Sequence, residues 1–227
     1  MEAIILAGGL GTRLAHVVKD VPKPMAPVAG RPFLEYILDD LAIQGAKHIV
    51  LAVCYKRESI ISHFGDSYRG IPIDYSIEDI PLYTGGAVKK AASLCQSSRV
   101  WVFNGDSYLQ VQMRQMASYA EKTDAAVTIA VKGMSNFSRY GRVEMDDNGF
   151  VTAFCEKAPC EQGFINGGIY YLKSQILVDY PDAFSLEDDC FPLILRNREI
   201  TAYRTDGYFV DIGVPDDYKT AQDYFHK

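Results

Sequence analysis

The sequence lacks the features that place a protein in a membrane or on a nucleic acid. No apolar run approaches the roughly 20 residues that a helix needs to cross a bilayer. Lysine and arginine form no run longer than two residues, and 23 basic residues stand against 29 acidic ones, for a net charge of −6. Because affinity for a phosphate backbone depends on clustered positive charge, we expect neither a nucleic acid nor a membrane as a partner.

The cysteines and histidines provide neither a disulfide framework nor a zinc site. The five cysteines are an odd number, and a chain of this length can remove roughly 70 to 75% of its unfolded surface from water without disulfides or a structural metal. Cys155 and Cys160 have no second Cys or His pair nearby. The four histidines show no metal-ligand spacing, and no Ser/His/Asp set lies where a nucleophile elbow would place it. We expect a reducing, cytoplasmic protein.

The first half of the chain alternates strand-like and helix-like segments. Residues 3–7 form an apolar run that ends at Gly8 and Gly9, as in a strand buried on both faces of a parallel sheet. After a loop rich in glycine and proline, helix patterns cover 32–45, 57–64 and 84–95, and strand patterns cover 48–53, 73–77 and 100–103. This order predicts an α/β fold with a mainly parallel sheet flanked by helices, whose ligand site lies beyond the carboxyl ends of the strands.

After residue 124 the pattern changes to short strands joined by turns. Strand patterns cover 125–131, 142–145, 151–155 and 169–172, with turns such as Asp147-Asn148-Gly149 between them. No linker or repeat separates the halves, so we expect the second half to continue the same sheet and to supply a lid or wall. Pro192 should break or kink any helix that starts at Ser185, and Pro215 suits a first helical position.

The loop after the first strand has the composition of a phosphate-binding loop. It reads Gly8-Gly9-Leu10-Gly11-Thr12-Arg13-Leu14, and its glycines allow backbone N–H groups to approach a ligand closely. It is not a Walker A loop, and Leu14 replaces the third glycine of a Rossmann fingerprint. Arg13 and Lys23 add two cations, so anion attraction is local in a chain of negative net charge. The alternative is a glycine turn with solvated cations.

Two aspartates follow apolar strand patterns. Asp106 ends the segment 100–106, and Asp211 ends the segment 208–211. A carboxylate at the carboxyl end of a strand faces the ligand crevice, and Mg²⁺ usually takes one or two carboxylates together with substrate phosphates. The pair predicts a magnesium site. The alternative is that each is a turn or helix-cap aspartate.

Several motifs together resemble the sugar-1-phosphate nucleotidylyltransferase family. They read Leu6-Ala7-Gly8-Gly9-Leu10-Gly11-Thr12-Arg13-Leu14, Pro22-Lys23-Pro24-Met25, Asn104-Gly105-Asp106, Glu156-Lys157, Asn166-Gly167-Gly168-Ile169-Tyr170 and Asp211-Ile212-Gly213. Motifs in one order are far more specific than any one alone. The resemblance implies the Rossmann-like nucleotide-diphospho-sugar transferase fold. It also implies one domain over 1–227, with a nucleotide-binding half (about 1–123) and a short-strand, sugar-phosphate-binding half (about 124–227).

The resemblance implies transfer of a nucleotidyl group from a nucleoside triphosphate to a sugar 1-phosphate, with Mg²⁺ as cofactor. Within the family, segments 24–27, 139–143 and 208–215 are most similar to guanylyltransferases of D-glycero-α-D-manno-heptose 1-phosphate. This implies GTP as the donor, a nucleotide sugar for lipopolysaccharide or capsule as the product, and leaves room for a homodimer. The alternatives are a mannose-1-phosphate guanylyltransferase, a glucose-1-phosphate uridylyl- or thymidylyltransferase and, more remotely, a nucleotide-binding oxidoreductase or a non-catalytic regulatory subunit.

The resemblance also assigns roles to individual residues. The catalytic set is Arg13 on the β and γ phosphates, Lys23 bridging the reacting phosphates, and Asp106, which holds Mg²⁺ together with Asp211. The nucleotide-binding set is Leu6, Ala7, Gly8, Gly9, Gly11, Thr12, Arg13, Glu78, Thr84, Gly85 and Asp106. The sugar-phosphate set is Lys23, Gly141, Glu156, Lys157, Asn166 and Gly167, with Lys157 on the phosphate and Glu156, Asn166 and the Gly141 N–H on sugar hydroxyls.

Glu78 is the residue expected to read the base. A carboxylate only accepts hydrogen bonds, and guanine presents N1–H and N2–H₂ as adjacent donors, whereas uracil and thymine offer one N–H between two carbonyls. Glu78 therefore predicts GTP. The alternative is that Glu78 is a solvated helix-capping acid and that Asp79 or backbone groups read the base. Tyr83 stands where relatives usually have glycine and puts a bulky ring beside the expected base pocket.

Overall fold

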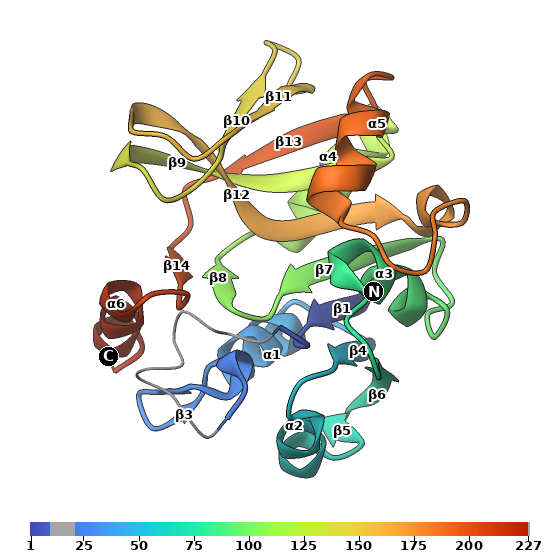
Figure 1. Cartoon of the computed structure of the whole chain (residues 1–227), viewed down its shortest axis with the longest axis vertical. Coiled ribbons are helices and arrows are strands. Elements are labelled where there is room, and N and C mark those ends of the chain that lie inside the picture. The colour runs from blue at the N-terminus through green and yellow to red at the C-terminus, as the bar shows by residue number, and fades with distance from the viewer. Residues whose placement is uncertain (10–20, 227) are drawn as a thin grey trace.

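One mixed sheet runs through both halves of the chain in the computed structural model, which describes residues 1–9 and 21–226 (Figure 1). Its ten strands follow the order β11-β10-β12-β7-β1-β4-β6-β5, with β9 beside β12 and β13 beside β9. Their bounds are β1 (Glu2–Leu6), β4 (His48–Val53), β5 (Ser67–Tyr68), β6 (Ile71–Ile77), β7 (Arg99–Asn104), β9 (Val127–Phe137), β10 (Arg142–Met145), β11 (Val151–Cys155), β12 (Cys160–Lys173) and β13 (Ile200–Thr205). Two small ribbons pair β2 (Pro27–Val28) with β3 (Arg31–Pro32) and β8 (Ser107–Leu109) with β14 (Phe209–Asp211).

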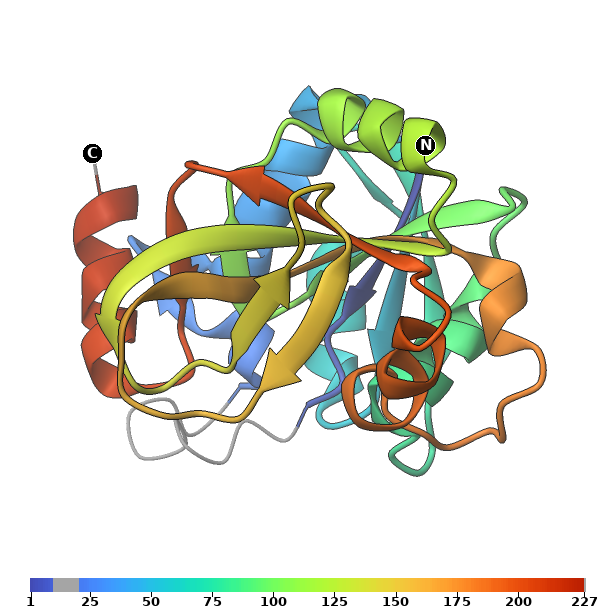
Figure 2. The same cartoon turned by 90° about the horizontal axis from the view of Figure 1, so that it is seen from above.

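Helices cover both faces of this sheet (Figure 2). They are α1 (Phe33–Ile43), α2 (Arg57–Phe64), α3 (Tyr83–Ala92), α4 (Met113–Thr123), α5 (Phe191–Leu195) and α6 (Pro215–Phe225). Successive side chains of a strand point to opposite faces, and β1 shows the consequence. Ile5 packs in a core with residues of α1, α2, α4 and α6, whereas Ile4 packs in a second core with residues of α3 and α5.

The parallel part of the sheet arises from local hydrophobic patterns. Strand β1 pairs in parallel with β4 and β7, and β4 pairs in parallel with β6. The helix that Pro32 precedes buries Phe33, Leu34, Ile37, Leu38 and Leu41, a stripe at helical spacing. The predicted α/β fold with a mainly parallel sheet flanked by helices is confirmed.

The second half departs from the predicted short strands. β9 has 11 residues and β12 has 14, both much longer than their predicted cores. Gly133 and Gly163 lie within the paired segment, and the glycines after Asn166 form an irregularity in the pairing with β9. The prediction missed β13, which pairs in parallel with β9. The short-strand expectation was therefore wrong for the two strands that cross the sheet.

The helical segment near Pro192 changes its winding instead of breaking. A π-helical turn, η3 (Leu186–Cys190), leads directly into α5, and Pro192 is the second residue of α5. Pro215 begins α6, as predicted. None of the helices among the described residues is both long and apolar enough to cross a membrane.

Candidate active site

The predicted residues of the first half gather at the carboxyl edge of the parallel strands. Gly8 and Gly9 follow β1, Glu78 follows β6, and Gly105 and Asp106 follow β7. The Gly105 N–H donates to the carbonyl oxygen of Leu6 at 3.0 Å, and a Cβ at Gly105 would lie 2.6 Å from that oxygen. Only glycine lets the end of β7 approach β1 this closely, and this contact aims Asp106 into the strand-end crevice.

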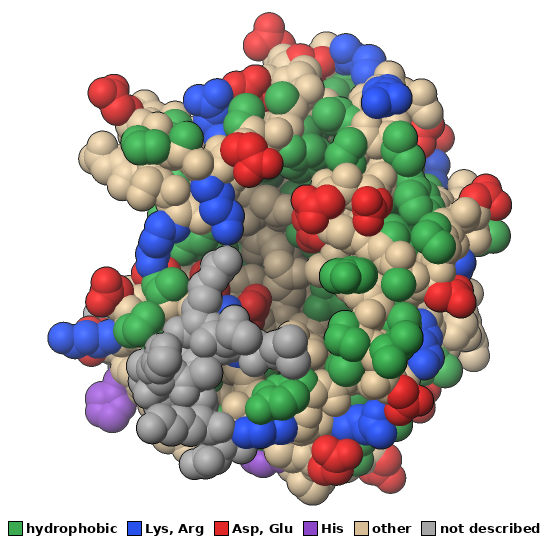
Figure 3. All heavy atoms as spheres, in the orientation of Figure 1, with side chains coloured by type: hydrophobic (Ala, Val, Ile, Leu, Met, Phe, Trp, Pro, Cys, Tyr) green, Lys and Arg blue, Asp and Glu red, His purple; other side chains and the backbone are tan. Residues whose placement is uncertain are grey.

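A hollow lies in the middle of one face of the molecule, and acidic and basic side chains surround it (Figure 3). Leu6 ends β1, and Ala7 is fully buried behind the glycines. The predicted nucleotide-binding residues Gly11, Thr12 and Arg13 lie outside the described residues.

Lys23, Asp106 and Asp211 form one charged group. Lys23 opens the short 3-10 helix η1 (Lys23–Met25), and its Nζ lies 2.7 Å from Asp106 Oδ2 and 3.4 Å from Asp211 Oδ1. Asp211 reaches this point because β14 pairs with β8, which places it opposite Ser107, the neighbour of Asp106. A Cβ at Gly213 would lie 2.8 Å from Asp211 Oδ1 and 3.0 Å from Lys23 Nζ, so glycine leaves the space that these charges occupy.

Burial and neighbouring charges act together on the carboxylates of this group. Burial raises the pKa of Asp211 above its ordinary value; the Lys23 ammonium opposes this effect, and the Asp106 carboxylate reinforces it. Among the described residues, Asp106 Oδ1 and Asp211 Oδ2 accept no hydrogen bond. Two adjacent carboxylates with free oxygens fit the donor set of Mg²⁺, which completes its shell with water and phosphate oxygens.

Glu78 lies between the glycine loop and the start of α3. Its side chain is only 5% exposed, and its Oε2 accepts the N–H of Leu82 at 3.0 Å. Oε1 faces the other side and would lie 3.6 Å from a Cβ at Gly8. Burial raises the pKa of Glu78, while the Leu82 N–H and Lys90 lower it. Glu78 thus bonds the residue that precedes α3, and it is buried, not solvated as the alternative expected; its role toward the base stays a prediction.

Thr84 and Gly85 lie in the first turn of α3, where packing accounts for the glycine. Gly85 donates its N–H to the carbonyl oxygen of Phe184 at 2.8 Å, so this N–H is already used within the protein. A Cβ at Gly85 would lie 2.3 Å from the Phe184 ring. The Thr84 hydroxyl donates to Glu187 Oε2 at 2.6 Å.

The predicted sugar-phosphate residues lie on neighbouring strands of the second half. Arg142 pairs with Cys155 and with Ile165, so Gly141, Glu156 and Asn166, which adjoin these three positions, are brought together. Glu156 and Lys157 are exposed in the loop between β11 and β12. Asn166 donates from Nδ2 to the Tyr170 hydroxyl and accepts the Gly168 N–H at Oδ1, each at 2.9 Å.

The sugar side and the charged group meet where β12 crosses β8. Gly167 is buried, and a Cβ there would lie 2.2 Å from a methyl carbon of Leu109. Gly168 has a positive φ of 74°, and a Cβ there would lie 2.8 Å from Ser107 Oγ. These close approaches place the Asn166 segment beside β8, the strand that directly follows Asp106.

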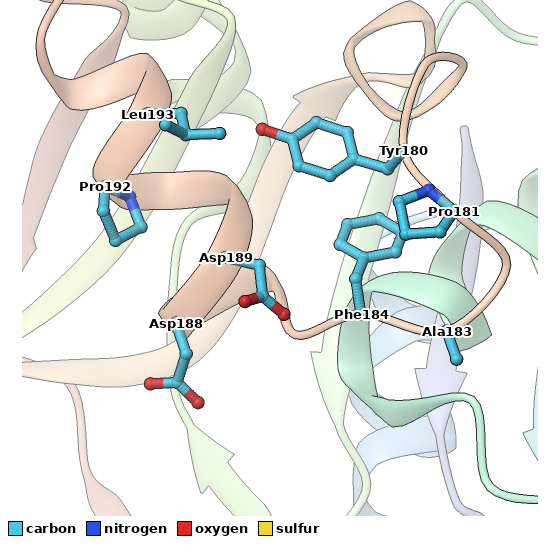
Figure 4. Close-up of a pocket in the computed structure, with 8 residues that line it drawn as sticks. All are labelled: Tyr180, Pro181, Ala183, Phe184, Asp188, Asp189, Pro192 and Leu193. Carbon is cyan, nitrogen blue, oxygen red and sulfur yellow. The ribbon is translucent and has the colours of Figure 1, made fainter.

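A cavity of about 440 Å³ lies behind the first turn of α3 (Figure 4). The stacked rings of Tyr180 and Phe184, whose centroids are 4.6 Å apart, face Leu193 and Asp189 across it. Its lining includes none of the predicted site residues. Phe184, which lines it, packs on Gly85.

A comparison with known proteins identifies the family. A family model described as "Nucleotidyl transferase" matches residues 2–227. The chain belongs to the nucleotidyl transferase family. Two relatives bear the name D-glycero-alpha-D-manno-heptose 1-phosphate guanylyltransferase. The one from Campylobacter jejuni is 43% identical over 223 residues (96% of this chain, 97% of the relative), and the one from Aneurinibacillus thermoaerophilus is 44% identical over 224 residues (98% and 97%).

A solved structure agrees with this membership. The crystal structure of HddC from Yersinia pseudotuberculosis complexed with GMP-PN matches with a TM-score of 0.88 and 36% identity, and the match covers 99% of both chains. The predicted family and its fold are confirmed. The roles of the individual site residues of this nucleotidyl transferase stay predictions.

Glu187 is a residue at this site that sequence reasoning missed. It lies in η3, and its carboxylate bonds both Thr84 and Tyr170, which come from α3 and β12. The partners of the first bond are 103 positions apart. No local spacing marks such a contact; the available signal was that Tyr170, inside an apolar strand, needs a buried partner for its hydroxyl.

Proposed function

We propose that this enzyme transfers the guanylyl group of GTP to D-glycero-α-D-manno-heptose 1-phosphate and forms GDP-heptose and pyrophosphate. The observation that carries the proposal is the 43 and 44% identity with two proteins of that name over nearly their whole lengths. The charged group of Lys23, Asp106 and Asp211 supports it, because nucleotidyl transfer needs cations around the reacting phosphates.

The reaction is an in-line displacement at phosphorus. A phosphate oxygen of the sugar 1-phosphate attacks the α-phosphorus of GTP, the bond to the bridging oxygen of the β-phosphate breaks, and pyrophosphate leaves. No covalent enzyme intermediate is required, so the protein contributes by positioning the reactants and by balancing charge. This agrees with a site that is built from glycines, a lysine and carboxylates.

Lys23 can serve both the protein and the phosphates. Its ammonium has three donors, and two of them are directed to Asp106 and Asp211. The third is available to a phosphate oxygen, so the carboxylates hold the ammonium in place while it neutralises developing charge. Mg²⁺, held by Asp106 and Asp211 through their free oxygens, would supply further positive charge at the same phosphates.

The two substrates would enter from different sides of the crevice. Glu78 Oε1 is directed toward the glycine loop, where it would accept the adjacent donors of guanine. Lys157 and Glu156, on the exposed loop of the second half, would hold the sugar phosphate and a sugar hydroxyl. Arg13 would hold the outer phosphates of GTP.

The experiment is a matrix of ATP, CTP, GTP, UTP and dTTP against heptose, mannose and glucose 1-phosphates, with pyrophosphate release as the measurement. We expect the highest kcat/KM for GTP with the heptose. Release with another pair only would contradict the proposal and would assign the enzyme to that pair. A second arm without Mg²⁺ should show no release.

The proposal includes a cellular setting. We place the enzyme in the cytoplasm, because all five cysteines are free thiols, and its product would serve lipopolysaccharide or capsule synthesis. A homodimer is part of the same expectation, and sedimentation of the purified chain would test it.

A further inference from the structure

A continuous chain of hydrogen bonds joins the predicted nucleotide side to the predicted sugar side. Thr84 Oγ1 donates to Glu187 Oε2 at 2.6 Å, and the Tyr170 hydroxyl donates to Glu187 Oε1 at 2.8 Å. Beyond Tyr170, the chain continues through Asn166 Nδ2 to the N–H of Gly168 at Asn166 Oδ1. Within this series of hydrogen bonds, Glu187 is the residue that bonds both Thr84, on the nucleotide side, and Tyr170, on the sugar side.

On the sugar branch, which runs from Glu187 through Tyr170 to Asn166, the carboxylate of Glu187 dictates the direction of both bonds of the Tyr170 hydroxyl. A carboxylate can only accept, so the Tyr170 proton must point at Oε1, and the Tyr170 oxygen must accept from Asn166 Nδ2. Tyr170 is 1% exposed, so its bonds are shielded from bulk solvent. The Tyr170 oxygen and the Gly168 N–H together hold the Asn166 amide in one orientation, with its second N–H and its second oxygen lone pair left for a ligand.

On the nucleotide branch, which runs from Glu187 to Thr84, the direction of the hydrogen bonds is also fixed. The Thr84 hydroxyl donates to Glu187 and accepts the Leu186 N–H at 2.9 Å. Its proton and one lone pair are therefore used, and it presents only an acceptor lone pair to the crevice. An acceptor at this point suits a base or ribose group that donates.

We propose that Glu187 is a positioning residue that sets the hydrogen-bond directions of Thr84 toward the nucleotide and of Asn166 toward the sugar phosphate. The inference rests on the proposed function for the identity of the two substrates. The π-helical turn that carries Glu187 is a form of backbone often found at functional sites. One side chain thus adjusts both halves of the site.

Two variants separate the branches. In Glu187→Gln, the amide oxygen should turn to the fully buried Tyr170, and its NH₂ should turn to the half-buried Thr84, whose hydroxyl must then present a proton. The KM for GTP should rise about fivefold to tenfold with little change in the KM for the sugar phosphate. Tyr170→Phe breaks only the sugar branch, so it should raise the KM for the sugar phosphate by a similar factor and leave that for GTP unchanged.

The control is Asp179→Asn, an exposed carboxylate that makes no hydrogen bond or ion pair with the other described residues. Both of its KM values should stay within about twofold of those of the wild type, and melting temperatures identify any loss of folding. Dissociation constants from calorimetry, measured in parallel, report the same split without turnover.

A merely structural role would lower the melting temperature or kcat without a substrate-selective change. Equal changes of both KM values in Glu187→Gln and Tyr170→Phe, or no change in either variant, would overturn the inference. Wild-type turnover tests the proposed function separately. If the wild type prefers another sugar 1-phosphate, the split is measured with that sugar, and the role of Glu187 stands or falls on it.

Discussion

At the scale of single residues, the structure explains why small and charged side chains alternate along the strand ends. Glycines at 105, 168 and 213 lie where a Cβ would strike Leu6, Ser107 or Asp211. They let neighbouring segments approach closely, and Lys23 lies between the Asp106 and Asp211 carboxylates and offsets their like charges. The consequences are testable one residue at a time.

Asp106→Asn should keep the fold and remove most turnover. The Asp106 side chain is 42% exposed, so the substitution costs little packing, but it removes a charged ligand and a partner of Lys23. We expect kcat to fall about a hundredfold or more, by analogy with the loss of a single charge-stabilising group. Asp147→Asn, in an exposed turn, is the matched control. Wild-type turnover of Asp106→Asn at limiting Mg²⁺ would show that Asp106 is no metal ligand.

Glu78→Gln tests how the base is read. The amide oxygen can keep the Leu82 N–H, which places the NH₂ where Oε1 now faces the crevice. The new NH₂ donor would then face the N–H donors of guanine. The kcat/KM for GTP should therefore fall by a factor that corresponds to about 1 to 3 kcal/mol, while the kcat/KM for UTP or dTTP should change little or rise. Steady-state kinetics with the three nucleotides measures this. An unchanged preference for GTP would show that Glu78 does not choose the base.

At the scale of elements, the patterns with strong local periodicity were predictable. The predicted bounds of β4, α2, β10 and β11 match the structure residue for residue, Pro32 directly precedes α1, and Pro215 begins α6. The lengths of β9 and β12 were not predictable, because glycine inside a strand has the same local signal as glycine in a turn. The link from Thr84 to Glu187 was also invisible, since it depends on η3 packing against α3.

The start of α3 contains a strained residue. Tyr83 has a positive φ of 58°, and its ring is 68% exposed. The left-handed conformation costs about 1 to 2 kcal/mol for a residue with a side chain, and the greater freedom of glycine in the unfolded chain offsets part of this. Tyr83→Gly should therefore raise the free energy of unfolding by about 0.5 to 1 kcal/mol, measured by urea denaturation.

Tyr83→Ala is the control for this prediction, because alanine removes the ring but keeps the Cβ that is disfavoured at positive φ. It should not stabilise the protein. If alanine and glycine stabilise equally, the exposed ring is the cause and not the backbone.

At the scale of the whole molecule, one carboxylate at the amino end of β1, opposite the strand ends that form the active site, connects three segments by hydrogen bonds. Glu2 accepts the N–H groups of Gln96 and Ser97 and a bond from His48 Nδ1. Burial raises the pKa of Glu2, but these hydrogen bonds outweigh burial and lower it from 4.5 to about 2. The amino-terminal strand is thereby fastened to β4 and to the turn before β7.

The stability that Glu2 contributes should depend on pH in a defined way. Because its folded pKa is depressed, the contribution is fully present above pH 4.5 and is lost as the pH falls toward 2. The shift corresponds to a contribution on the order of 3 kcal/mol at pH 7. Glu2→Gln should lose stability at pH 7 and approach the wild type near pH 2, as measured by urea denaturation. An equal difference at both pH values would contradict this linkage.

The central claim is the substrate pair, and competition tests it most directly. With GTP and Mg²⁺ fixed, D-glycero-α-D-manno-heptose 1-phosphate and mannose 1-phosphate are supplied together, and the two GDP-sugars are separated and quantified. We predict that GDP-heptose dominates, since the chain aligns over nearly its full length with the heptose enzymes. A preference of more than about tenfold in kcat/KM for mannose 1-phosphate, about 1.4 kcal/mol, would contradict the account.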